Sequence, residues 1–105
     1  MSTPTDHRPD LLTVVASMRA RSGKEEELRE LLQGVIEPTK QEAGCVNYDL
    51  HQSITDSAVF YFYENWESAE HLDAHLQSSH LQHALSRADE LLDGTLTIER
   101  LQRIA

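Results

Sequence analysis

The chain has almost no cysteine and no long hydrophobic run, and both absences limit where it can reside. Its single cysteine, Cys45, cannot form an internal disulfide, a pattern typical of a reducing compartment. No apolar stretch approaches the ~18 residues that suggest a membrane-spanning helix. The N-terminal segment also lacks the apolar region of a secretory signal peptide. We therefore expect a cytoplasmic protein without a membrane-spanning helix.

Basic residues and glycines are also scarce. The 9 Lys and Arg residues are outnumbered by 18 Asp and Glu residues, which gives a net charge of −9. Such a charge repels nucleic-acid phosphates and anionic lipids. The glycines, at positions 23, 34, 44 and 94, are too widely spaced to form a phosphate-binding or dinucleotide-binding loop. The sequence therefore favours neither nucleic-acid binding nor a nucleotide-derived cofactor.

What is present fits one small domain behind a short tail. Residues 1–10 are polar and contain Pro4 and Pro9, so we expect a flexible N-terminal tail there. The remaining residues, 11–105, are enough for a single hydrophobic core without disulfides or a structural metal. We therefore predict one domain over residues 11–105.

Hydrophobic periodicity predicts the secondary structure of this domain. Two-residue alternation predicts strands over residues 11–20, 45–52, 58–66 and 95–103. A capping box at Ser22 and Glu25 predicts the start of an amphipathic helix, which Pro38 should end or kink. Two further helices are expected, one over residues 68–77 with Ser68 as its cap, and one that is capped by Ser78 or Ser79.

This order of elements predicts an α+β fold. Strand, helix, two strands, helices and a last strand form the ferredoxin-like split βαβ sandwich, whose four-stranded antiparallel sheet carries helices on one face. The opposite face of the first and third strands still bears Val15, Tyr61 and Tyr63. An apolar face of that kind needs a cover. We therefore predict a homodimer in which a second copy provides it.

Two finer expectations concern strand geometry. In the second strand, alternation places Val46, Tyr48 and Leu50 on one face and Cys45, Asn47 and Asp49 on the other. In the last strand, Leu101 falls out of phase with Leu96 and Ile98, which predicts a bulge near Arg100. Tyr48 is the tyrosine that we expect to face the helices.

Residues 59–83 contain the candidate site. The only tryptophan, Trp66, shares a strand face with Glu64 and Phe62, and the following helix carries His71 and His75. Trp66 is either a core anchor or a flat wall for a planar ligand. His75 is either a packed or solvated histidine or a proton acceptor, a role suited to a side chain whose pKa lies near neutrality.

Histidine spacing alone does not predict a metal site. His71 and His75 are four residues apart, and His80 and His83 are three apart, so either pair shares a helix face. That spacing could hold a divalent metal, but no His-Glu-x-x-His pattern supplies a carboxylate. We therefore expect no metal to be required.

Parts of the chain resemble the antibiotic biosynthesis monooxygenase family, and most of all its bacterial quinol monooxygenase branch. The resemblance lies in residues 12–16, 42–48 and 64–80, and its most specific part is a Glu-x-Trp and His-x-x-x-x-His string formed by Glu64, Trp66, His75 and His80. It covers nearly the whole domain. The fold that the resemblance implies is a ferredoxin-like homodimer whose two sheets face each other, a dimeric α/β barrel.

The resemblance also implies a reaction and a site. Family members of this branch oxygenate their substrates without flavin, haem or metal, and Trp66 and His75 match positions that line their pocket. We take His75 and Trp66 as the catalytic candidates. We place Tyr48, Phe62, Glu64 and His80 at the substrate, without a chemical step for Glu64 or His80.

The function expected from residues and resemblance together is a cofactor-independent monooxygenase of quinol or related aromatic, polyketide-like substrates, with molecular oxygen as co-substrate. Two alternatives stay open: an isomerase of a small metabolite on the same fold, and a ligand-binding dimer without turnover. Haem degradation is disfavoured, because haem-degrading members place an asparagine on the first strand where Ser17 stands in this chain.

Overall fold

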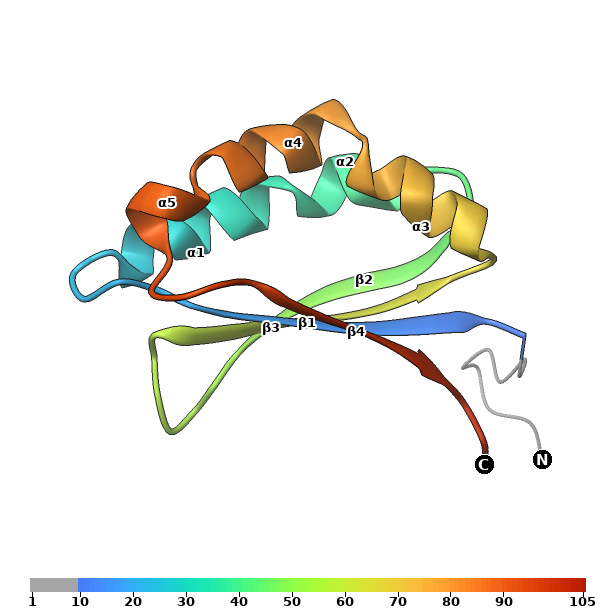
Figure 1. Cartoon of the computed structure of the whole chain (residues 1–105), viewed down its shortest axis with the longest axis horizontal. Helices are drawn as coiled ribbons and strands as arrows, with labels where there is room; N and C mark the ends of the chain where they lie inside the picture. Colours follow the sequence, from blue (N-terminus) through green and yellow to red (C-terminus); the bar gives the residue numbers. More distant parts are fainter. Residues whose placement is uncertain (1–9) are drawn as a thin grey trace.

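The computed structural model describes residues 10–105, so the expected tail lies, except for Asp10, outside the described residues. The elements are β1 (Leu12–Arg19), α1 (Glu25–Gly34), α2 (Ile36–Lys40), β2 (Cys45–Gln52), β3 (Val59–Trp66), α3 (Ala69–Leu76), α4 (Ser79–Ser86), α5 (Ala88–Leu91) and β4 (Thr97–Gln102). The strands form one antiparallel sheet in the order β2-β3-β1-β4, with the helices on one face (Figure 1). The predicted ferredoxin-like α+β fold is confirmed.

Pro38 breaks the first helical segment, as predicted. Its ring has no N–H to donate and would collide with the carbonyl of the residue four positions earlier, which is Gly34. The helix α1 ends at Gly34, and α2 begins again at Ile36. Among residues 10–105, no helix combines the length and the apolar character needed to span a membrane.

The capping box predicted at Ser22 is wrong. The helix α1 begins at Glu25, and no side chain caps its N-terminus. A turn precedes the helix, because the Lys24 amide donates to the Arg21 carbonyl at 2.9 Å and Gly23 adopts a φ of +85° between these two residues. Ser22 is therefore part of the turn and lies too early to cap the helix. The cap predicted at Ser68 is confirmed, because its hydroxyl accepts from the His71 amide. Of the two candidates for the next cap, Ser78 and Ser79, Ser78 is the cap, and its hydroxyl accepts from the Leu81 amide.

At the start of β2, Cys45 and Val46 lie on the opposite sides of the sheet from those that the sequence predicts. The β2–β3 register shifts between Cys45 and Asn47, which is a bulge at Val46. Cys45 therefore lies opposite Trp66 on the helix-facing side and packs against the core, whereas Val46 is exposed. The extra residue in the bulge exchanges the sides on which Cys45 and Val46 would lie if the strand alternated regularly. Tyr48 faces the helices as predicted.

The last strand carries no bulge. Its pairing with β1 is continuous from Ser17–Thr97 to Leu12–Gln102. Leu101 is out of phase with Ile98 because the two residues lie on opposite faces of the sheet, Ile98 beside Ala16 and Leu101 beside Thr13. The bulge predicted near Arg100 is therefore wrong, and Leu101 adds an apolar side chain to the face away from the helices.

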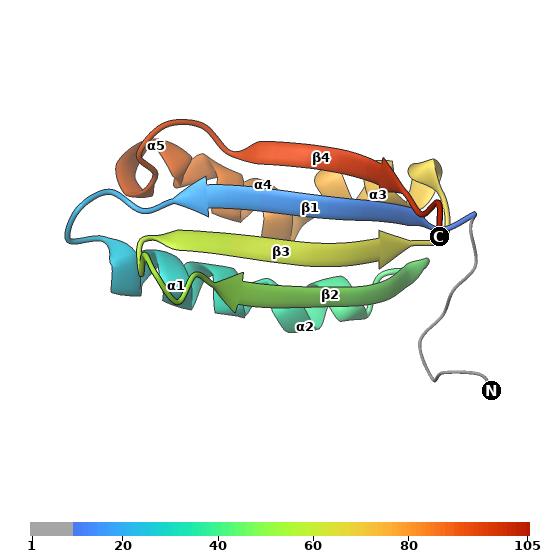
Figure 2. The same ribbon diagram turned by 90° about the horizontal axis from the view of Figure 1, so that it is seen from below.

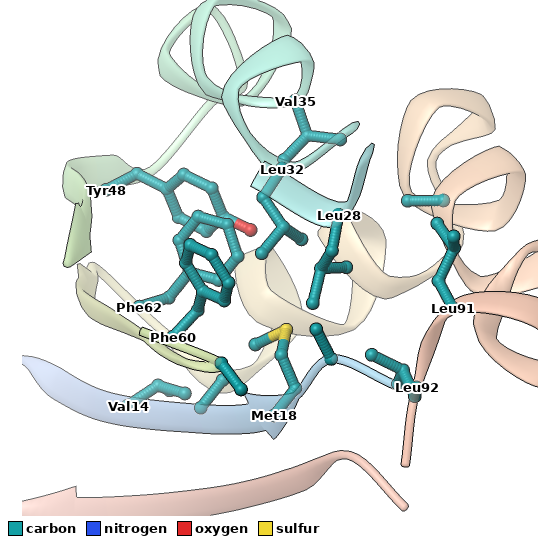
Figure 3. Packing of buried hydrophobic residues seen from close by; sticks show 14 of the residues in the cluster. Val14, Met18, Leu28, Leu32, Val35, Tyr48, Phe60, Phe62, Leu91 and Leu92 are labelled. Atoms are coloured by element: carbon teal, nitrogen blue, oxygen red, sulfur yellow. The ribbon is translucent and has the colours of Figure 1, made fainter. Parts of the chain in front are cut away.

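The core fills the space between the helices and the inner sheet face. Aromatic side chains from β2 and β3 meet leucines from α1 and the C-terminal helical segment, as Figure 3 shows. The buried members with labels there are Val14, Met18, Leu28, Leu32, Val35, Tyr48, Phe60, Phe62, Leu91 and Leu92. Periodicity alone places these side chains inward, since α1 carries an apolar stripe and the strands alternate.

The opposite sheet face is open in the described chain (Figure 2). We call it the outer face and define it by Val15, Tyr61, Tyr63 and Leu101, which the strand registers place on the same side. Tyr61, Tyr63 and Leu101 are 41%, 45% and 44% exposed. The outer face is therefore apolar in its centre and covered by no described helix.

Candidate active site

A cavity of about 80 Å³ lies between the inner sheet face and the helices. Most of its lining is aliphatic, with residues from β1, α1, α3, α4, α5 and β4. The polar lining side chains are those of Tyr48, Glu64, His75 and Arg87. Leu85 and Ile98 line the cavity and are also exposed to solvent. An apolar lining with few polar groups is typical of small-molecule sites, although such sites are usually larger, at ~300–1,000 Å³.

His75 is the buried histidine of this cavity. The Ser68 cap sets the start of α3, and the helical repeat then places Leu72 and His75 toward the sheet. The imidazole is 2% exposed and packs against Trp66, with ring centroids 4.8 Å apart, and against the edge of Tyr48 at 5.2 Å. Burial lowers the pKa of His75 below its usual 6.5, although the hydrogen bond and charge of Glu42 oppose this. The ring is therefore mainly neutral at neutral pH.

Glu42 joins two histidines. Its Oε2 lies 2.9 Å from His75 Nδ1 and 2.7 Å from His80 Nε2. Glu42 lies in the turn between α2 and β2, and His80 lies in the first turn of α4. Ser78, the cap of α4, donates to the His75 carbonyl at 2.7 Å and so ties the two helices together. We call Glu42, His75 and His80 the Glu–His cluster.

Within residues 10–105, the Glu–His cluster is the set of residues that could hold a metal. Its three ligand atoms lie within 4.8 Å of one another. Two histidines and a carboxylate are donors that divalent transition metals accept. However, both nitrogens lie at hydrogen-bond distance from the same carboxylate oxygen, so the cluster is already satisfied by hydrogen bonds. The two histidine pairs that share a helix face do not form a site, since His71 bonds to Ser68 and His83 is exposed.

Glu64 is a second buried titratable group in the cavity wall. It is 4% exposed, and its Oε1 accepts a hydrogen bond from Trp66 Nε1 at 2.8 Å. Burial raises the pKa of Glu64 to about 7, the indole hydrogen bond opposes the shift, and the charge of Glu42 adds to it. Glu64 can therefore exist as a neutral acid or as a carboxylate near neutral pH.

The structure divides the predicted site residues into two groups. Tyr48, Phe62, Glu64 and His75 line the cavity, with Tyr48 and Phe62 stacked at a centroid distance of 4.6 Å. Trp66 and His80 do not line it. Trp66 is fully buried behind His75, whereas His80 contacts Glu42.

The structure places Ser17 away from the cavity, and it shows one site residue that the sequence analysis missed. Ser17 pairs with Tyr61 on the outer face, so it does not face the cavity, and β1 instead presents Val14, Ala16 and Met18 to it. Glu42 was missed because a turn residue has no periodicity and its partners are at least 33 residues away. Its presence in the family-like stretch at residues 42–48 was the available signal.

Comparison with known proteins supplies the family context. The family model described as antibiotic biosynthesis monooxygenase matches residues 11–87. The Mycobacterium tuberculosis protein named "Putative monooxygenase Rv0793" is 35% identical over 83% of this chain and 85% of its own length. The Synechocystis protein sll1783 is 30% identical over 79% of this chain, which spans 56% of that relative.

Solved structures agree with the sequence matches. PA3566 from Pseudomonas aeruginosa superposes with a TM-score of 0.87 at 34% identity and covers 95% of this chain and 100% of its own. The structure of Rv0793 superposes with a TM-score of 0.85 and covers 90% of this chain and 96% of its own. These similarities extend through the elements that form the cavity.

Proposed function

Because the chain belongs to the antibiotic biosynthesis monooxygenase family, we propose that it oxidises a quinol or related aromatic, polyketide-like substrate with molecular oxygen, without flavin, haem or metal. The observation that carries this proposal is His75. It is a buried, mainly neutral histidine in the wall of an apolar cavity. A neutral imidazole there is suited to accept a phenolic proton from a bound aromatic ring.

The reaction needs no external electron donor. A deprotonated hydroquinone is electron-rich enough to pass an electron to oxygen. One oxygen atom then forms a new C–O bond on the ring, and the other leaves as water with two hydrogens from the substrate. The hydroquinone becomes a hydroxyquinone, so the substrate supplies all the electrons. The proton that His75 accepts returns to the departing oxygen atom, which completes the balance.

The remaining side chains have supporting roles in this proposal. Tyr48 and Phe62 present a stacked aromatic wall to a planar substrate. Glu64 offers a carboxyl group that hydrogen-bonds a substrate oxygen, and the indole of Trp66 holds that carboxyl in place. Trp66 is thus a positioning residue behind His75 and Glu64. The apolar lining excludes water from the reacting atoms.

The test is oxygen uptake by the purified protein with a panel of hydroquinones and anthrone-like phenols, in a buffer that contains a metal chelator. His75→Ala should lower turnover by about 10²–10⁴-fold, the usual contribution of a positioned proton acceptor. The loss should shrink at high pH, where the substrate ionises unaided. His83→Ala, at an exposed position on α4, is the matched control and should retain full turnover.

The outcomes separate the alternatives. Product formation under strict anoxia would favour an isomerase. Tight binding of the panel without turnover would favour a ligand-binding protein. Loss of turnover in the chelator, or unchanged oxygen uptake in His75→Ala, would contradict the proposed mechanism.

We further propose that the protein acts as a homodimer that pairs through the outer face. The exposure of Tyr61, Tyr63 and Leu101 on a strand-formed surface supports this. Haem is a poor substrate in this proposal, because β1 presents only the apolar Val14, Ala16 and Met18 to the cavity.

A further inference from the structure

We propose that Glu42 is a positioning residue for His75, whose ring it holds as the Nδ1–H tautomer so that Nε2 stays available to accept a proton. The catalytic consequence rests on the proposed function. The tautomer itself is a property of the ligand-free protein and can be tested without a substrate. Neither the family-like motif nor the cavity lining assigns a role to Glu42.

The argument begins with what a carboxylate can do. An ionised carboxylate only accepts hydrogen bonds, and Glu42 Oε2 lies 2.9 Å from His75 Nδ1. The hydrogen of a neutral His75 ring is therefore on Nδ1, and the lone pair is on Nε2. Without the carboxylate, a neutral imidazole carries its hydrogen on either nitrogen. A ring with its hydrogen on Nε2 could not accept a proton from a ligand at that atom.

The carboxylate is itself held from a second side. His80 Nε2 lies 2.7 Å from the same Oε2, and by the same reasoning it is a donor. Ser78 Oγ lies 3.2 Å from His80 Nε2 and also donates to the His75 carbonyl. The side chains of Glu42 and His80 are 16% and 22% exposed, against 2% for His75. The Glu–His cluster thus anchors a fully buried ring to a partly hydrated carboxylate.

Glu42 also favours the imidazolium form of His75, which the proposed reaction forms transiently. When Nε2 accepts a proton, the new imidazolium already faces a carboxylate at hydrogen-bond distance. The rings of Tyr48 and Trp66 that pack against His75 carry no charge, whereas the charge of His80, whose ring centroid lies 6.1 Å away, lowers the pKa of His75 and so opposes Glu42. Glu42 need not take the proton, because the bond to Nδ1 persists in both states.

The first experiment reads the tautomer directly. Proton–nitrogen correlation NMR of ¹⁵N-histidine-labelled, ligand-free protein should show a neutral His75 with its hydrogen on Nδ1. Glu42→Ala should move the hydrogen to Nε2 or produce a mixture. Glu37→Ala removes the same charge from an exposed position on α2 and should leave the spectrum of His75 unchanged.

The wild-type spectrum alone is decisive, even if Glu42→Ala does not fold. A neutral His75 with its hydrogen on Nε2 in the wild type would overturn the proposal. So would an unchanged Nδ1–H tautomer in a folded Glu42→Ala variant. Failure of the proposed function would appear differently, as a wild-type protein with the expected tautomer but no oxygen uptake.

The second experiment uses non-additivity. If Glu42 acts only through His75, then Glu42→Ala should lower turnover, and the double variant Glu42→Ala/His75→Ala should be no slower than His75→Ala alone. A merely structural role predicts that the two losses multiply. Multiplied losses, or full turnover in Glu42→Ala, would refute the catalytic part of the proposal.

Discussion

At the scale of single residues, Glu64 links burial to pH-dependent stability. Its pKa is raised from a usual 4.5 to about 7, mainly because burial penalises the charged form. Between these values the folded protein binds more protons than the unfolded chain, so the free energy of unfolding falls as the pH rises through this window. Above pH 7 the contribution levels off. A shift of this size corresponds to about 3 kcal/mol.

Glu64→Gln should remove this fall in the free energy of unfolding, because the amide oxygen can still accept from Trp66 but the amide does not ionise. Urea unfolding at pH 4.5 and pH 8 measures the free energy of unfolding of both proteins. Between these pH values, the free energy of unfolding of Glu64→Gln should rise by about 3 kcal/mol relative to that of the wild type. Subtraction cancels the other titrating groups, including His75. The exposed Glu70→Gln serves as control, and an equal wild-type–variant difference at both pH values would refute the assignment to Glu64.

Sequence reasoning found the wall of the cavity better than its supporting contacts. Phe62 and Glu64 share a strand face with Trp66, and His75 follows on the helix that packs over that face, so periodicity alone brings these residues together. Glu42 joins them through a contact across 33 sequence positions, which no local pattern encodes. Strand and helix periodicity thus predicts the residues on the sheet and helix that surround the site. It does not predict the Glu42 carboxylate that contacts the histidine.

At the scale of elements, the turn before β2 depends on Gly44. Its φ is +80°, which strongly favours glycine, and a Cβ there would lie 2.2 Å from Cγ of the His71 ring. Gly44→Ala should therefore suffer both backbone strain of about 1–2 kcal/mol and overpacking of about 1–3 kcal/mol. Thermal or urea unfolding would measure the loss.

Gly94→Ala separates the two causes. Gly94 has a similar φ of +86°, but nothing lies within 4 Å of an added Cβ. It should show the backbone strain alone, so Gly44→Ala should be the more destabilised variant by about 1–3 kcal/mol. Equal losses in the two variants would mean that His71 moves aside without cost.

Element order was predictable because hydrophobic alternation and helical stripes are strong local signals. Element ends were less so. Ser68 and Ser78 cap helices as expected, whereas the turn around Gly23 leaves Ser22 outside α1. The misjudged bulge in β4 has a different cause. The bulge was predicted because Leu101 is out of phase with Leu96 and Ile98, but its apolar side chain belongs to the outer face of a regular strand.

At the scale of the whole molecule, the sheet separates two apolar regions. Its inner face, together with the helices, encloses the core and the cavity, and its outer face carries Val15, Tyr61, Tyr63 and Leu101. Strands that are apolar on both sides are normally covered on both sides. In a chain whose described helices all lie on one side (Figures 1 and 2), a second copy is the cover that we propose for the other.

The homodimer leads to a direct prediction. Obligate interfaces of this kind bury roughly 2,000 Å² or more, so the wild type should sediment as two chains at micromolar concentration. Tyr61→Asp places a charge in the centre of the outer face and should weaken the dimer by at least about 30-fold, or ~2 kcal/mol. Leu101→Asp tests the same face from β4 if Tyr61→Asp does not fold. Ile54→Asp is the control, because Ile54 is fully exposed in the loop between β2 and β3 and should leave the mass unchanged. A monomeric wild type, or a dimer that survives both outer-face substitutions, would show that the outer face is not the interface.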